Sequence, residues 1–223
     1  MKTNPSILPS SSTSTLAAAL VLASTAGVFQ LRAQDEAAAM RERIAALEKR
    51  LSELESREAG EKARERLREQ NKMSARKRAA EDRRRYKPEE LAEIESLYQI
   101  ANKKWRSDEA RESLKKLLEK YHDANRTGCS LLYMGQMSKG KERVEYLTRA
   151  VEEFSDCFYL DGCQVGGYGR YVLAMTLWEN GDKDRALALL AELKGRYKDA
   201  IDHMGRPMSA VAEAAEASIA AEP

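Results

Sequence analysis

The chain has few of the residues on which most metal sites and catalytic sites depend. It contains 2 His and 3 Cys in 223 residues, and neither His122 nor His203 stands in ligand spacing with two cysteines. The four glycines between residues 162 and 169 are not followed by the Gly-Lys-Ser/Thr sequence of a phosphate-binding loop. No Ser-His-Asp or paired-carboxylate arrangement stands out. These absences predict a protein without a metal ion, a cofactor or enzymatic activity.

Aromatic residues are also scarce, at 6% of the chain, whereas charged residues make up 33%. The hydrophobic share of 43% comes mostly from Ala and Leu, which favour helices. This composition is typical of an all-α protein with a highly charged, elongated portion. The net charge of +2 is distributed unevenly, because residues 61–87 contain twelve Lys/Arg against five Asp/Glu, which gives this segment a charge of +7.

Residues 1–33 are predicted to be a signal peptide or a membrane anchor. The segment from Leu16 to Leu31 carries no charge. It is shorter than the roughly 20 residues of a membrane-spanning helix, and it resembles the apolar region of a signal peptide. Either interpretation exports the remaining chain, so we expect a periplasmic or other extracytoplasmic location, with a membrane contact if the segment is not cleaved. The alternative is a buried helix of a soluble protein.

Residues 34–60 are predicted to form a coiled coil. Large apolar residues recur here at alternating spacings of 4 and 3: Met40, Ile44, Leu47, Leu51 and Leu54. This period of 3.5 residues is the seam of a coiled coil, and the flanking Arg and Glu residues would pair between parallel helices. We therefore expect a homo-oligomer, either a dimer or a trimer. The alternative is a single, solvated, charged helix.

Residues 61–87 keep a helix-forming composition but lose the apolar stripe. They are predicted to be a basic helical linker exposed to water. As an alternative, the runs Arg76-Lys77-Arg78 and Arg83-Arg84-Arg85 could bind an anionic surface such as lipid headgroups. No aromatic residues are interleaved to stack on bases, so nucleic acid is not an expected partner. Pro88, followed by two glutamates, is a typical helix start.

A short phrase recurs three times in the remaining chain, residues 88–223. It centres on Tyr121, Phe154 and Tyr197, each followed two residues later by Asp. The first interval is 33 residues and the second is 43. Each aromatic residue ends an apolar helical stretch, and a repeat near this length is typical of stacked helix pairs.

The spacing within these stretches resembles the tetratricopeptide repeat. The small and large positions of the second helix of that repeat match two sets of residues: Ala110, Leu114 and Leu117, and Ala186, Leu190 and Leu193. Gly135 stands at the small position of a first helix, whereas the terminal proline and the signature tryptophan of the family are missing. The resemblance implies an α-solenoid with a protein or peptide partner in its groove. The whole layout is similar to that of the Tol–Pal-associated periplasmic cell-division coordinators.

Helical spacing predicts which residues face such a groove. They are Gln99, Asn102, Lys103, Gln136, Tyr171, Met175 and Trp178. An Asn amide can hold a peptide backbone by two hydrogen bonds, and Trp178 is either a binding residue or part of the core. The leading interpretation is a non-enzymatic adaptor or scaffold of the bacterial cell envelope.

The longer second interval places an insertion between residues 156 and 169. It contains Cys157 and Cys163, which could form a disulfide in an exported protein, while Cys129 precedes it. Three buried thiols are the alternative. A thiol-based redox enzyme is therefore a competing function. The glycines of this insertion predict either a flexible connection or close packing between helices.

The seam gives a first testable prediction. Replacing Leu47 and Leu51 with Asp should convert the oligomer to a monomer, because each helix would then bury two negative charges in the seam. Analytical ultracentrifugation at micromolar concentration measures this. The control replaces Ala45 and Ser52, which lie off the seam, with Asp. A wild-type chain that is already monomeric would show that the coiled coil does not form.

Overall fold

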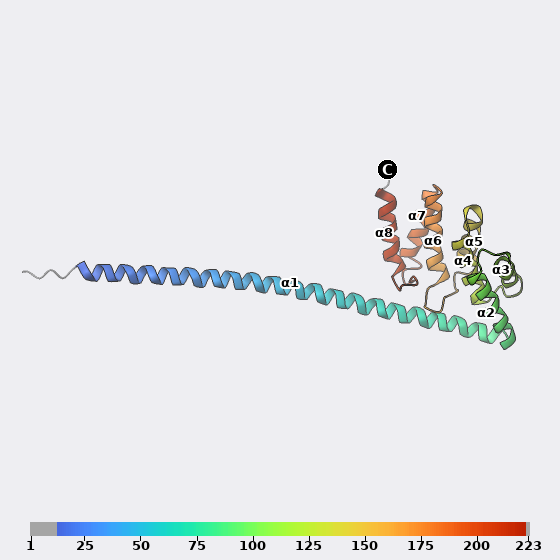
Figure 1. The fold of residues 1–223 in the computed structure, drawn as a ribbon, viewed down its shortest axis with the longest axis horizontal. Helices are drawn as coiled ribbons and strands as arrows, with labels where there is room; N and C mark the ends of the chain where they lie inside the picture. Colours follow the sequence, from blue (N-terminus) through green and yellow to red (C-terminus); the bar gives the residue numbers. More distant parts are fainter. Residues whose placement is uncertain (1–12, 222–223) are drawn as a thin grey trace, which may run out of the picture. The chain divides into compact units, whose positions relative to one another are not determined.

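The computed structural model describes residues 13–221, and every regular element in that range is an α-helix (Figure 1). By their internal contacts, Met1–Ala59 and Gly60–Pro223 form two separate units. The first helix, α1 (Thr13–Arg85), contributes to both units. The all-α prediction is therefore confirmed for the described range.

The first unit contains the N-terminal part of α1. Of the predicted signal or anchor, residues 1–12 lie outside the described residues, and the remainder to residue 33 is helical. Within the described residues, no helix is both long enough and apolar enough to cross a membrane. The five residues of the predicted seam are all exposed, with exposed fractions between 48% and 65%.

The second unit consists mainly of helix pairs. Its helices after α1 are α2 (Pro88–Lys103), α3 (Asp108–Lys120), α4 (Asn125–Met137), α5 (Gly140–Glu153), α6 (Val165–Glu179), α7 (Lys183–Lys194) and α8 (Met208–Ala221). The helices pack in the pairs α2–α3, α4–α5 and α6–α7. Helices α2, α4, α6 and α8 also contact one another in that order, so they form one continuous layer (Figure 1).

Local sequence signals explain where these helices begin and end. At the start of α2, the Glu90 carboxylate accepts a hydrogen bond from the Lys87 backbone N–H, at 2.8 Å. Ser107 caps α3 by accepting from the Ala110 N–H. Between α6 and α7, Gly181 adopts a φ of 85°, which favours glycine, and Asp182 caps α7.

The aromatic residues of the repeated phrase lie where three helices end. Tyr121, Phe154 and Tyr197 are all buried in the core. The backbone N–H of Tyr121 donates to the Leu117 carbonyl, and that of Phe154 donates to the Ala150 carbonyl. The aromatic side chain therefore anchors the end of each helix while the chain turns toward the next pair.

The last five residues of the predicted insertion, residues 165–169, belong to α6, which begins at Val165. Three of its glycines lie inside α6, where neighbours leave no room for a side chain. A Cβ on Gly166 would lie 2.5 Å from the Ser155 carbonyl, and one on Gly169 would lie 2.8 Å from Val151. A Cβ on Gly167 would collide with Ala200. Close packing, rather than a flexible connection, therefore accounts for these glycines.

The C-terminal part of α1 docks on the loops that connect the pairs. Asn71 donates to the Asp199 carbonyl at 2.8 Å, and Arg78 donates to the Asp123 carbonyl at 2.6 Å. The exposed Arg85 pairs with the Asp123 carboxylate at 2.7 Å. Residues 61–87 are therefore not a helix solvated on every side, because one face of this segment packs on the fold through polar contacts.

A buried carboxylate is at the centre of this docking. Asp82 accepts a hydrogen bond from Arg78 at 2.6 Å and another from the Asn125 backbone N–H at 2.9 Å. The Asn125 side chain in turn exchanges two hydrogen bonds of 2.7 Å with the Phe158 backbone. This network joins α1, the start of α4 and the loop before α6.

Asp82 gives the second testable prediction. Replacing it with Ala should lower the free energy of unfolding of the full chain by about 3 kcal/mol, because Arg78 and the Asn125 N–H lose their buried acceptor. Urea denaturation measures the change. The neighbouring Glu81 is exposed, so Glu81→Ala is the matched control and should have little effect. Equal stability of the two variants would contradict the role assigned to Asp82.

Candidate functional site

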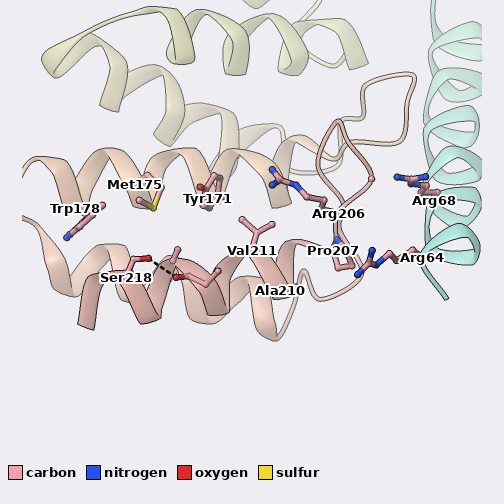
Figure 2. A pocket seen from close by; sticks show the side chains of 13 residues that line it. Arg64, Arg68, Tyr171, Met175, Trp178, Arg206, Pro207, Ala210, Val211 and Ser218 are labelled. Atoms are coloured by element: carbon pink, nitrogen blue, oxygen red, sulfur yellow. Dashed lines mark hydrogen bonds between the residues drawn. The ribbon is translucent and has the colours of Figure 1, made fainter. Parts of the chain in front are cut away.

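A groove of about 660 Å³ lies between α6 and α8 in the second unit, and α1 closes one end of it (Figure 2). The groove is open to solvent on one side. Its lining residues are Arg64, Arg68, Tyr171, Met175, Trp178, Gly205, Arg206, Pro207, Ala210, Val211, Ala214, Ala215 and Ser218. Among the described residues, no acidic side chain lines it.

One wall of the groove is a row of large side chains on α6. Tyr171, Met175 and Trp178 are separated by four and three residues, so they share one face of the helix. All three are half-buried, while Leu173 and Leu177 on the opposite face are buried in the core. Helix α6 is apolar nearly all round, so the core cannot cover both of its faces.

The other wall is the alanine-rich helix α8. Ala210, Ala214 and Ser218 follow at intervals of four residues, and these small side chains leave space beside the large residues of α6. The Ser218 hydroxyl donates to the Ala214 carbonyl at 3.0 Å. The groove therefore results from pairing a helix that has bulky side chains with one that has small side chains.

A tight turn before α8 places Arg206 at the groove. Buried Asp202 accepts hydrogen bonds from the backbone N–H groups of Met204 and Arg206, at 2.9 and 2.8 Å. Its other carboxylate oxygen lies 2.6 Å from Arg206 Nε, and this contact raises the pKa of Arg206. Gly205 adopts a φ of 74° within the turn. The guanidinium group thus remains charged and held in place.

Of the seven residues that the sequence predicted for partner binding, only Tyr171, Met175 and Trp178 line this groove. The other four lie on α2 and α4. Gln99 donates to Glu95 at 2.7 Å, and Lys103 is exposed at the end of α2.

The remaining two residues contact tyrosines. Asn102 lies beside Tyr98, and its Oδ1 is buried without a hydrogen-bond partner among the described residues. A peptide backbone therefore cannot reach this oxygen in the present arrangement. Burial raises the pKa of Tyr168, and a hydrogen bond with Gln136 opposes that shift.

Sequence reasoning missed the contribution of α1 and α8 to the site. Arg64, Arg68 and Arg206 have no apolar periodicity around them, and their order along the chain does not show that they meet. A signal for the docked face did exist, because Asn71, Ala75, Arg78 and Asp82 are spaced 4, 3 and 4 residues apart. This spacing describes a stripe of polar and small residues on one side of a helix.

The structure contains no disulfide between Cys157 and Cys163, and all three cysteines are buried free thiols. The Tyr159 N–H donates to the Cys163 carbonyl at 2.8 Å, and the Val165 N–H donates to the Cys157 carbonyl at 2.9 Å. Cys157 and Cys163 are therefore diagonal neighbours across an antiparallel turn, for which the residues are about 7–8 Å apart and the Cβ atoms somewhat closer. A disulfide requires a Cβ separation of about 4 Å.

Burial also raises the pKa of each thiol. It raises the pKa of Cys157 to about 12, against the opposing effect of nearby Arg78, and it also raises those of Cys129 and Cys163 well above the usual range. The thiolate is the reactive form of cysteine, so these side chains are weak nucleophiles near neutral pH.

The two histidines lie in separate surroundings. His203 Nδ1 lies 2.7 Å from the Asp161 carboxylate, and its ring packs edge-on against Tyr159 and Tyr168. This contact ties the loop before α6 to the turn before α8. His122 packs against Phe154, with its Nε2 3.4 Å from Glu153. Across residues 13–221, no cluster of three or more His, Cys, Asp or Glu residues is suited to hold a metal ion.

The Cys157 thiol gives the third testable prediction. Above pH 9 the wild-type chain should lose stability relative to Cys157→Ala, because the unfolded chain releases the thiol proton near the ordinary pKa of 9.0 while the folded chain keeps it to about 12. Between pH 9 and pH 12, the free energy of unfolding of the wild type should fall relative to that of Cys157→Ala by up to about 1.4 kcal/mol per pH unit. Urea denaturation at pH 8 to 11 under reducing conditions measures it. A stability difference independent of pH would contradict the raised pKa.

Comparisons with known proteins add no assignment to these observations. A scan against protein-family models found no match for the chain, and searches of the curated proteins and of the solved structures found no significant similarity.

Proposed function

We propose that this protein is a non-enzymatic, protein-binding adaptor of the bacterial cell envelope, built as a tetratricopeptide-like solenoid. The groove between α6 and α8 is the observation that carries the proposal. Concave, largely apolar surfaces with a few fixed polar groups are where proteins bind ligands. Tyr and Trp, which are enriched among the residues that dominate binding energy, are half-buried here and not sealed in the core.

The arrangement of the helix pairs supports the solenoid. Ala110 and Ala186, at matching positions of α3 and α7, are completely buried, as the repeat pattern requires of its small residues. The first two pairs meet mainly through α2 and α4, the second and third pairs meet mainly through α5 and α6, and α8 packs mainly on α7. Such stacking provides extended surfaces for partner proteins, and α8 covers the final pair.

The exposed seam supports oligomerisation. Five of the eight large hydrophobic side chains that are exposed in the described chain belong to it, within fifteen residues of one helix. A surface of this kind on a charged helix is suited to pairing with a second copy. An oligomer would present several grooves and strengthen weak individual contacts through avidity. The envelope location depends on the apolar N-terminal segment of the sequence.

The two competing functions gain less support from the side chains. The thiols are buried and protonated, which does not favour redox chemistry. Within the basic segment, Arg78 pairs with Asp82 and Asp156 and Arg85 pairs with Asp123, although nine of its twelve basic side chains are exposed. We therefore retain protein binding as the proposed function.

The fourth prediction tests binding directly. The full chain should select peptides from a phage library of random 12-residue sequences, and Trp178→Ala should weaken their binding about 30-fold, as expected for a central aromatic residue. Fluorescence anisotropy with synthetic copies of the peptides measures the affinity. Trp105→Ala, which removes the other tryptophan from a site outside the groove, is the control. Failure to select any peptide, or equal affinities for wild type and Trp178→Ala, would contradict the proposal.

A further inference from the structure

The two ends of the groove differ in chemistry. Trp178, Met175 and Tyr171 follow one another along α6, and Arg206 comes next in the same line (Figure 2). Arg64 and Arg68 of α1 close the end beyond Arg206. Tyr171 and Trp178 are seven positions apart, which is about 10 Å along the helix. An elongated ligand would therefore contact apolar side chains along the groove and guanidinium groups at one end of it.

The three arginines differ in how far their charges are already compensated. Arg206 faces the buried Asp202 carboxylate, and Arg68 donates to the Met204 carbonyl at 2.6 Å and lies 3.8 Å from Glu65. Arg64 is exposed and makes no hydrogen bond or ion pair with any other described residue. Its guanidinium group is therefore the one that remains available to a ligand.

We propose that the groove binds an acidic amphipathic segment of a partner protein. Its apolar side chains would lie on Tyr171, Met175 and Trp178, and an Asp or Glu side chain would face Arg64. A carboxylate matches the fork of a guanidinium group through two parallel hydrogen bonds. This inference depends on the proposed protein-binding function and adds the chemistry and the orientation of the partner.

The walls of the groove suit a peptide. Ala210 and Ala214 on α8 have side chains too short to keep a second backbone at a distance. The hydroxyl groups of Tyr171 and Ser218 lie at the two walls, where they can hydrogen-bond with main-chain groups of a bound segment. Because the groove is open to solvent, a chain longer than the groove can continue past the end at Trp178.

The fifth prediction concerns charge. A peptide selected by the full chain is synthesised in two forms, one with its Asp and Glu residues and one with Asn and Gln in their place. We expect the acidic form to bind about five-fold more tightly at 50 mM salt, and this advantage to shrink at 300 mM salt because the contact is exposed. Equal affinities for the two forms would overturn the proposal.

The protein variants locate the effect. Arg64→Gln should weaken the acidic peptide about five-fold and leave the neutral peptide unchanged, whereas Arg66→Gln is the matched control because Arg66 is exposed and does not line the groove. Equal losses for the two variants would overturn the assignment of Arg64.

Two further outcomes separate this inference from the proposed function. If Trp178→Ala weakens both peptide forms while Arg64→Gln weakens neither, the groove binds peptides without selecting charge, and only the present inference is wrong. If dodecanoate displaces the peptide and binds more tightly than the peptide does, the groove binds a lipid chain. The proposed protein-binding function is then wrong as well.

Discussion

The buried carboxylate of Asp82 is the contact on which the arrangement of the second unit depends. It allows a strongly basic helix segment to pack on the fold, because a guanidinium group and a backbone N–H both donate to it away from water. Through Asn125 the same network reaches the Phe158 backbone, so three segments distant in sequence are held together. Removing one member leaves the others buried without partners, which makes such networks sensitive to single changes.

This docking also explains how α1 takes part in the candidate site. A continuous helix is stiff over the 18 residues from Arg64 to Asp82, which is about 27 Å. Contacts at Arg78 and Asp82, together with the Asn71 bond to the Asp199 carbonyl, therefore determine where Arg64 and Arg68 lie. Positive charge that the sequence predicts in a solvated linker instead lines one end of the groove.

The two faces of α6 are packed differently. Leu173, Ala174 and Leu177 fill the core, and three glycines at the start of the helix allow its backbone to approach Ser155, Val151 and Ala200. The remaining apolar face lies opposite α8, whose facing side chains are mostly small. Close packing on one side of the helix and incomplete filling on the other are what leave Tyr171, Met175 and Trp178 accessible to a partner.

Periodicity in the sequence was enough to predict an all-α fold and to place Tyr171, Met175 and Trp178 on one face of a helix, because apolar residues at helical spacing are buried together. The side chains of Ser107 and Asp182 cap α3 and α7 by accepting hydrogen bonds from N–H groups of those helices. The positions of Asp82, Asn125 and Arg64 were decided only by the tertiary structure. Their partners lie on other elements, and a hydrogen bond between segments 43 residues apart leaves no local pattern in the sequence. The apolar spacing thus determined which faces are buried, whereas polar contacts between distant segments decided where the groove ends and which charge faces it.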